Sequence, residues 1–342
     1  MNKPIENISE VEQGYRWEGA KAASRKMAAR LYAVGLNKRA ARMWTCGDYL
    51  AIRKAENGEL IADAPQLCHD RLCPMCSWRL SRRRFAEMMA VFNALAPEII
   101  ERGYKATMLT LTIKNMKLSD LRRSIDGMAT AWHNLIRREF FRDVVGWARS
   151  LEITYNAQAQ TYHPHMHIIL IWARYDNTQA TADTIRDGWK AACNLDYSPV
   201  IDIREVYSRD GDRDEESKHA LIKSALEAFK YAVKPDCSEK IPQSDLFEFA
   251  GAIKGVRFVS YGKAIKRARA ALGFKNEETA DDESDVKNEL PDETIIALLA
   301  WSGTKYAPAI LTEGKWRFNP AELSAAAAIV SRETKTEGEN EE

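Results

Sequence analysis

The chain has 342 residues, of which 45% are hydrophobic and 9% aromatic, and this composition can fill the core of one large domain or two smaller ones. Its apolar runs are too short to span a bilayer, and the opening residues hold no apolar segment of the kind that makes a secretory signal. These features argue against a membrane protein or a secreted protein, and we expect a folded protein of the cytoplasm.

The formal net charge of +1 hides an asymmetry along the chain. Residues 16–90 contain 15 Lys or Arg against 7 Asp or Glu, and they include the triplet Arg82-Arg83-Arg84. Residues 276–293 contain nine acidic residues and a single lysine. A basic segment of this kind is either a solvated face or a surface that attracts phosphate, whereas the acidic segment is most simply a linker.

Four of the six cysteines lie in the N-terminal third of the chain. Cys68, Cys73 and Cys76 have a Cys-x4-Cys-x2-Cys spacing, which lets several thiolates reach one ion and indicates zinc in a cytosolic chain. Disulfides are the competing interpretation, but a reducing compartment and the tight spacing of Cys73 and Cys76 argue against them. The sequence therefore predicts a structural zinc site.

The fourth ligand of this site has two candidates. Cys46 is favoured, because a loop returns a distant thiolate more easily than the adjacent Cys68 and His69 can both reach one tetrahedron. His69 stays the alternative. Cys193 and Cys237 have no such neighbours, and we expect them to be ordinary thiols.

The middle of the chain alternates between strand and helix patterns. Residues 106–113 are rich in β-branched side chains and predict a strand, and residues 118–141 carry apolar side chains at helical spacing. Residues 150–155 and 162–172 then predict two strands of a hairpin, joined by a short polar segment.

Three of the six histidines fall on the second hairpin strand. His163, His165 and His167 alternate with other residues, so they project from one face, where neutral imidazoles suit a divalent cation better than they suit a core. Glu152 shares that face and completes the site if the antiparallel register places it opposite His165 or His167. A slip of one residue would turn Glu152 away and leave His163 as the third ligand.

A helix is predicted over residues 216–234, where one apolar stripe ends at a proline. Glu227 and Tyr231 are four residues apart and lie on the same side of this helix, beside Lys230 and Lys234. A phenolic oxygen attacks phosphorus when a metal polarises the phosphodiester and cations stabilise the developing charge. A carboxylate one turn away can activate water for a second attack.

These segments together resemble the plasmid rolling-circle replication initiators that have a His-hydrophobic-His metal motif and a single catalytic tyrosine. The resemblance covers roughly residues 46–266, and its motifs are specific only in combination. The matching segments, in family order, are Cys73–Arg79, Leu109–Asn115, His163–His167, Glu227–Tyr231 and the glycine-punctuated Gly255–Gly262.

The resemblance implies an α+β fold of the His-hydrophobic-His nuclease type: a central antiparallel sheet flanked by helices, with an N-terminal zinc-binding segment. It implies that His165 and His167 bind Mg²⁺ or Mn²⁺ and that Tyr231 attacks one phosphodiester of the origin to form a 5′-phosphotyrosine link. The released 3′-hydroxyl then primes leading-strand synthesis. In members with this spacing the Glu directs water at termination, so Glu227 would allow a second cleavage and strand joining.

The division into regions follows from the motifs. We expect a basic zinc-binding and DNA-contacting region over residues 1–100, a metal-dependent nicking and joining domain over residues 101–272, and an acidic linker with a partly disordered appendage over residues 273–342. Residues 295–299 would suit a short helix in that appendage. Phosphate contacts are expected from Arg79, Arg82, Arg83, Arg84, Lys230 and Lys234.

The implied partners are plasmid origin DNA, both double-stranded and single-stranded, and host helicase and replication proteins, with no membrane. A relaxase or a small transposase would use the same motif, but relaxases place the tyrosine before the histidines and such transposases lack the cysteines. The non-enzymatic alternative is a zinc-dependent DNA-binding regulator in which the histidines hold a second structural ion.

Overall fold

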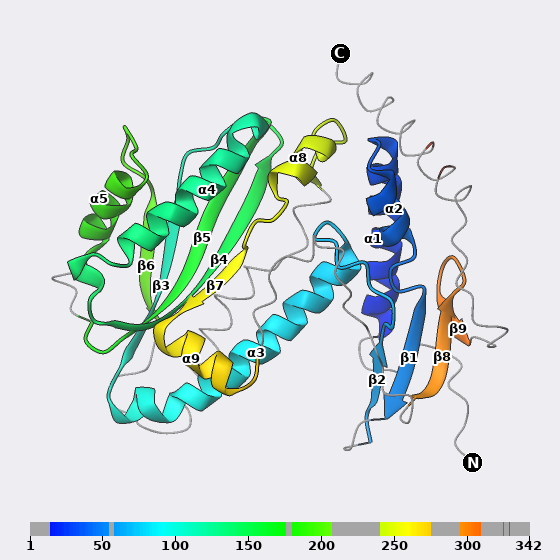
Figure 1. Ribbon diagram of the computed structural model, residues 1–342, viewed down its shortest axis with the longest axis horizontal. Coiled ribbons are helices and arrows are strands. Elements are labelled where there is room, and N and C mark those ends of the chain that lie inside the picture. Colours follow the sequence, from blue (N-terminus) through cyan, green and yellow to red (C-terminus); the bar gives the residue numbers. More distant parts are fainter. Residues whose placement is uncertain are drawn as a thin grey trace. The chain divides into compact units, whose positions relative to one another are not determined.

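The fold is that of a computed structural model, which describes residues 14–54, 58–175, 180–206, 240–274 and 295–308, together with the single residues 324 and 328. The chain is α+β, with two antiparallel sheets flanked by helices (Figure 1). It divides into two compact units. The first unit comprises residues 1–79, 241–250 and 280–342, and the second comprises residues 80–240 and 251–279.

The first unit pairs N-terminal helices with a four-stranded sheet in the order β2-β1-β8-β9. The segment at residues 241–250 joins this unit through Gln243, whose side chain accepts from Arg30 Nε at 3.1 Å and donates to the Arg30 carbonyl at 2.9 Å. The elements of the first unit are α1 (Gly14–Ala33), α2 (Asn37–Trp44), β1 (Tyr49–Lys54), β2 (Leu60–Asp63), the start of α3 (Pro74–Glu101), most of α8 (Leu246–Ala252), β8 (Ile295–Trp301) and β9 (Tyr306–Pro308).

The helix expected at residues 295–299 is wrong, because these residues belong to strand β8. A short, continuous apolar run suits a buried strand as well as a buried helix, so the pattern alone does not decide between them. Strand pairing makes this segment a strand: β8 lies antiparallel to β1, and Leu299 lies opposite Leu50, with both side chains fully buried.

The second unit is built on a five-stranded antiparallel sheet in the order β6-β3-β5-β4-β7, so β5 is central (Figure 1). The predicted strand at residues 106–113 and both predicted hairpin strands are present. The helix expected over residues 118–141 ends earlier, and a 3-10 turn follows it. The elements are β3 (Lys105–Thr112), α4 (Leu118–Leu135), η2 (Glu139–Phe141), β4 (Val144–Asn156), β5 (Thr161–Trp172), α5 (Ala182–Ala192), β6 (Ile201–Val206), β7 (Val259–Gly262) and α9 (Lys263–Ala271).

Strand β4 begins six residues before the predicted start of the hairpin. Most of these residues are buried, so the alternation of polar and apolar side chains that marks a half-exposed strand is lost. The longer strand reaches β7 on its outer side, where Ala148 lies opposite Tyr261.

The two faces of this sheet are covered by different helices. One face packs against α3 and α9, and its core includes Phe92, Ile169, Ile171 and Ile265. The other face packs against α4, where the ring of Trp132 lies edge-on to Trp147 with their centroids 5.5 Å apart. In the part of the chain that the structure describes, no helix is long and apolar enough to cross a membrane.

Position 262 requires glycine because the side chain of Trp147 packs directly against its backbone. It lies opposite Trp147 in the β4–β7 ladder, and a Cβ at this position would come within 2.1 Å of the indole ring. Its backbone is extended, with φ −144°, so the constraint is steric and not conformational. Gly127, on an exposed turn of α4, has open space instead: nothing lies within 4 Å of the point that a Cβ would occupy.

We therefore expect Gly262→Ala to lower the free energy of unfolding by about 1–3 kcal/mol, because the indole must be displaced. The matched change Gly127→Ala should raise it by roughly 0.5–1 kcal/mol through better helix propensity. Urea unfolding of both variants measures this. A Gly262→Ala variant as stable as the parent would contradict the packing described.

Candidate metal centres

The register of β4 against β5 determines which side chains meet on the histidine face. Glu152 lies directly opposite His165, and Ser150 lies opposite His167. Because paired residues project from the same side of the sheet, the carboxylate of Glu152 and the two imidazoles share one face. Their side chains are 13–17% exposed, so the group is half-buried.

The three side chains converge on one point. Glu152 Oε2 lies 3.2 Å from Nε2 of His165 and 3.2 Å from Nε2 of His167. One ligand atom from each residue falls within 4.8 Å of the other two. Two imidazole nitrogens and a carboxylate oxygen, converging in this way, form a donor set that can hold a divalent metal ion and leave coordination positions open.

The Nδ1 atoms of His165 and His167 contact neighbouring oxygen atoms. Nδ1 of His167 lies 3.3 Å from Thr110 Oγ1, and Nδ1 of His165 lies 3.2 Å from the carbonyl oxygen of His163. Such contacts fix the ring orientation and leave Nε2 directed at the common point. Thr110 was not predicted from sequence, although its place in an alternating strand beside the histidines is a usable signal.

His163 lies outside this convergent group within the described residues. Its ring stacks on that of His165, with centroids 5.3 Å apart and an interplanar angle of 29°. Burial, and then the neighbouring His165, lower the pKa of His163. For Glu152, burial is outweighed. It acts to raise the pKa of the carboxyl group, but hydrogen bonds with His165 and His167 lower that pKa to about 2.

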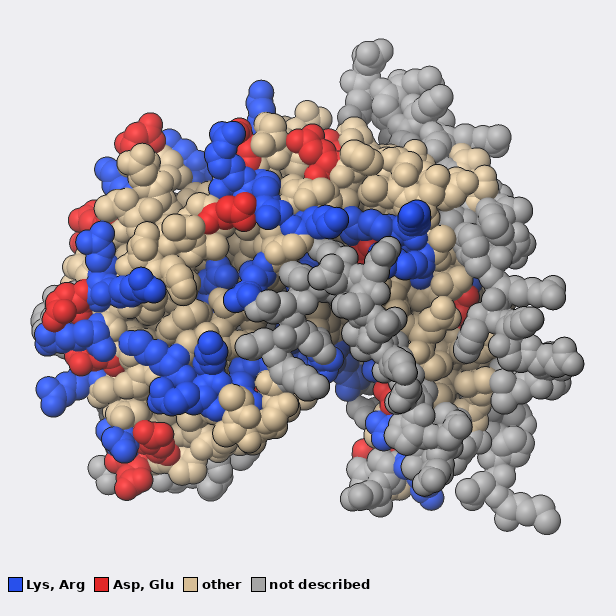
Figure 2. Space-filling view, viewed as in Figure 1, with Lys and Arg blue, Asp and Glu red and all other residues tan. Residues whose placement is uncertain are grey.

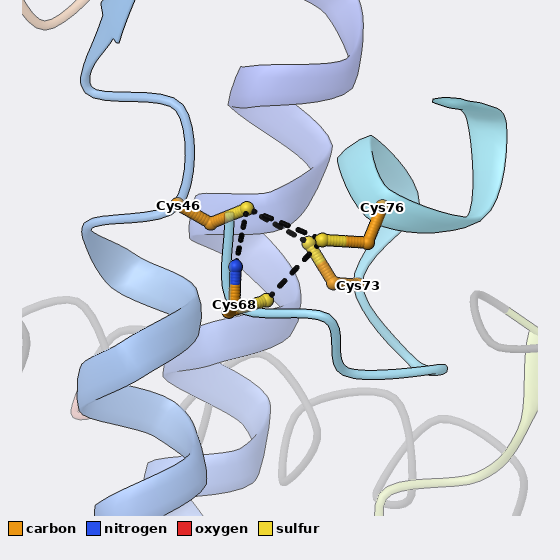
Figure 3. A group of neighbouring side chains, drawn as sticks. All are labelled: Cys46, Cys68, Cys73 and Cys76. Carbon is orange, nitrogen blue, oxygen red and sulfur yellow. Dashed lines mark hydrogen bonds between the residues drawn. The ribbon is translucent and has the colours of Figure 1, made fainter. Parts of the chain in front are cut away.

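The second group consists of four buried cysteines in the first unit (Figure 3). Cys46 follows α2, Cys68 lies in the loop before α3, Cys73 immediately precedes α3, and Cys76 lies in its first turn. Their sulfur atoms all fall within 4.8 Å of one another. His69, the alternative to Cys46, does not belong to this group.

The sulfur separations fit a tetrahedral ion. Sγ of Cys76 lies 3.5 Å from that of Cys46 and 3.6 Å from that of Cys68, and Cys73 Sγ lies 3.7 Å from Cys46 Sγ. Zinc–sulfur bonds of about 2.3 Å in a tetrahedron require sulfur atoms about 3.8 Å apart. The group is therefore able to hold a metal with little rearrangement.

Polar groups from α1 support the cysteines. Ser24 Oγ lies 3.3 Å from Cys73 Sγ, and the fully buried Lys21 donates to the carbonyls of Trp44 and Cys46 at 2.8 Å each. Burial lowers the pKa of Lys21, and the ion pair with Asp48 at 2.6 Å acts in the opposite direction. Sequence reasoning missed Lys21 and Ser24, since nothing in a polar residue of an N-terminal helix signals burial.

The surroundings shift the pKa values of the clustered thiols in different directions. Burial acts to raise the pKa of the Cys73 thiol, but hydrogen bonds with the neighbouring thiols and with Ser24 outweigh burial and lower that pKa. Burial, and then hydrogen bonds with Cys46, Cys73 and Cys76, raise the pKa of the Cys68 thiol. Outside the group, Cys193 is half-buried and burial raises its pKa to about 12.

The predicted DNA-contacting arginines differ in their surroundings. Arg82 and Arg83 are exposed on α3, and Arg83 is paired with Glu87 at 3.4 Å. Arg84 is 8% exposed, and Arg79 bonds Asp63 at 3.1 Å. Several predicted functional residues lie outside the described part of the chain, namely Glu227, Lys230, Tyr231 and Lys234, as does Cys237.

Comparison with known proteins identifies relatives over most of this region. The model of a family described as "Replication protein" matches residues 59–307. A "Protein rep" from Streptococcus pneumoniae serotype 2 is 29% identical over 301 residues, covering 84% of this chain and 90% of the relative. A "Protein rep" from Bacillus amyloliquefaciens is 31% identical over 290 residues, covering 78% and 84%.

A "Replication protein" from Staphylococcus aureus is more distant, at 26% identity over 212 residues that cover 58% of this chain and 88% of the relative. No solved structure matches the chain significantly. The family match spans well over half of the sequence and contains both β4 and β5 with their convergent side chains, as well as three of the four clustered cysteines. The chain therefore belongs to the replication protein family.

Proposed function

We propose that this replication protein initiates plasmid rolling-circle replication as a metal-dependent enzyme that nicks and rejoins origin DNA. The observation that carries the proposal is the convergence of Glu152, His165 and His167 on one point of a half-buried sheet face, within the region matched by the family. A five-stranded antiparallel sheet with the histidine strand at its centre supports the His-hydrophobic-His nuclease fold.

Mg²⁺ or Mn²⁺ held there would polarise the scissile phosphodiester and offset the charge that develops on its oxygens. Among the protein ligands, the geometry supports Glu152 as the third in place of His163, because its carboxylate oxygen reaches both Nε2 atoms while His163 stacks behind. Thr110 keeps His167 in the orientation that binding requires.

Tyr231 is the proposed nucleophile. Its phenolic hydroxyl loses its proton as the oxygen forms a bond to phosphorus, the bond between phosphorus and the 3′-oxygen breaks, and the departing oxygen takes up a proton to become the 3′-hydroxyl that primes synthesis. Glu227, one helical turn away in the sequence, would direct water for the second cleavage at termination. Lys230 and Lys234, on the same predicted helix, would stabilise phosphate charge.

The cysteine group is proposed to hold structural zinc. Four thiolates form a closed site that leaves no position for substrate, and this is the arrangement of structural zinc in proteins. The ion would join the loop before β1 to the start of α3, so it supports the first unit and takes no part in the chemistry.

Origin DNA, double-stranded and single-stranded, is the proposed partner, with host helicase and replication proteins acting after the nick in the cytoplasm. Figure 2 shows Lys and Arg outnumbering Asp and Glu on the face of the second unit turned to the viewer. Arg82 and Arg83 offer exposed guanidinium groups for salt-sensitive phosphate contacts. We propose that residues 101–272 carry out nicking and joining and that the basic N-terminal region, residues 1–100, binds the origin DNA.

Replacing one cysteine tests the zinc proposal. We expect the purified protein to contain one zinc per chain and Cys46→Ser to lose it and to unfold at lower urea, because binding energy is folding energy at such sites. The control Cys193→Ser removes a half-buried thiol outside the group and should keep the zinc. His69→Gln should also keep it. Full zinc occupancy in Cys46→Ser, measured by atomic emission, would remove Cys46 from the site.

Nicking of a supercoiled plasmid that carries the cognate origin tests the enzyme. With Mn²⁺, we expect Tyr231→Phe to abolish both the nick and the covalent protein–DNA adduct, while Tyr104→Phe on the same unit leaves both intact. His165→Ala should slow nicking by roughly 100-fold or more, because it removes several kcal/mol of transition-state stabilisation. An active Tyr231→Phe would overturn the choice of nucleophile, and a wild-type protein that binds the origin without nicking would favour a regulator.

A further inference from the structure

We propose that Lys114 and Tyr197 form a subsite beside the Glu152–His165–His167 centre that binds a DNA phosphate neighbouring the scissile one. The identification of the ligand as DNA rests on the proposed function. The subsite itself rests on the position of these two residues, on their contacts with each other and on the absence of an acidic partner for Lys114 among the described residues.

The sheet places Lys114 next to the histidines. Strand β3 pairs with β5 so that Thr112 lies opposite His165, and Lys114 follows two residues later. The chain keeps alongside β5 beyond this point, since Met116 exchanges backbone hydrogen bonds with Tyr162. With strands about 4.8 Å apart and about 3.4 Å per residue, the backbone of Lys114 lies roughly 8 Å from that of His165. This separation is close to that of neighbouring phosphates on one DNA strand, about 6–7 Å.

Tyr197 fixes the lysine in this place. The ammonium group of Lys114 lies 4.0 Å above the centre of the Tyr197 ring, and the Lys114 backbone N–H donates to the Tyr197 hydroxyl at 2.7 Å. A hydrogen bond from the Thr112 hydroxyl to the Val200 carbonyl, at 2.7 Å, ties the end of β3 to the start of β6 close by. An aromatic ring reduces the freedom of an exposed lysine without neutralising its charge.

The charge of Lys114 is left for a ligand. The side chain is exposed, and within the described ranges it makes no ion pair. An ammonium group at the same end of the sheet as the metal ligands attracts an anion, as a bound divalent cation would. Successive phosphates of one DNA strand supply two such anions, one for the metal centre and one for Lys114.

Binding to a single strand of uniform sequence tests the subsite without requiring cleavage. We would measure the affinity of the full-length chain for a twelve-nucleotide oligothymidylate by fluorescence anisotropy at several salt concentrations in the presence of Mn²⁺. We expect Lys114→Gln to weaken binding about 3- to 10-fold and to reduce the slope of log K against log salt by about 0.7, the value for one lost phosphate contact on a single strand.

Matched variants separate position from charge alone. Lys117→Gln removes an exposed lysine three residues later, which has no aromatic partner in the described structure, and should change affinity less than twofold. Tyr197→Ala should reproduce part of the Lys114→Gln loss, and the double variant should bind no more weakly than Lys114→Gln. Tyr197→Phe keeps the ring beneath the ammonium and should retain most of the affinity.

Two results would overturn the subsite: Lys114→Gln binding as wild type does, or Lys117→Gln losing as much affinity as Lys114→Gln. Urea midpoints confirm that each variant is folded. In a nicking assay on origin DNA, Lys114→Gln should raise the KM for DNA more than it lowers kcat. If the wild type nicks but Lys114→Gln binds normally, the subsite fails and the proposed function stands. If the wild type does not nick but Lys114→Gln binds the oligonucleotide more weakly than the wild type does, the subsite stands and the proposed function fails.

Discussion

The pairing of β4 with β5 is the constraint on which the candidate catalytic centre depends. Side chains alternate along a strand, so moving one strand by a single residue would carry Glu152 to the opposite face and leave the histidines without their carboxylate. The register is held by burial on that opposite face, where Leu151 and Met166 are paired and almost completely buried. A slip would expose such apolar side chains to water, so the same pattern that forms the core also assembles the metal ligands.

Strand β5 combines these two tasks along its length. Its first half presents His165 and His167, and its second half presents Ile169 and Ile171, on the same face, to the core formed with α3 and α9. The apolar half anchors the strand, and the polar half stays accessible at the end of the sheet. The proposed phosphate subsite at Lys114 extends this polar end to the residues just after the neighbouring strand β3.

The cysteine group has a different role in the first unit. Its sheet is closed by β8 and β9, which come from the far end of the chain, so the contacts that hold it are distant in sequence and costly to form. A metal that links Cys46 to Cys73 and Cys76 would restrict the N-terminal part of the unit independently of those strands. Buried Lys21 and its partner Asp48 lie against this arrangement.

The sequence predicted the features that have a strong local period or spacing. The β4–β5 hairpin, strand β3 and the four clustered cysteines belong to this class. The structure contains these strands, with β4 starting six residues earlier than predicted, and it brings the four sulfur atoms together. Residues 295–299 were mistaken for a helix because the partner strand that defines β8 lies far away in sequence. The contact of Thr110 with His167 depends on the pairing of β3 with β5, so the alternation of β3 suggests which face Thr110 occupies but not which residue it meets. The roles of Tyr231 and Glu227 stay predictions.

The most direct test of the account is whether the metal at the histidine face touches the phosphate that is cut. Sulfur can replace either non-bridging oxygen of the scissile phosphate, and Mg²⁺ binds sulfur poorly while Mn²⁺ tolerates it better. We expect one of the two phosphorothioate isomers to be nicked slowly with Mg²⁺ and to recover with Mn²⁺. Equal sulfur effects with both metals, for both isomers, would contradict direct contact and with it the central claim.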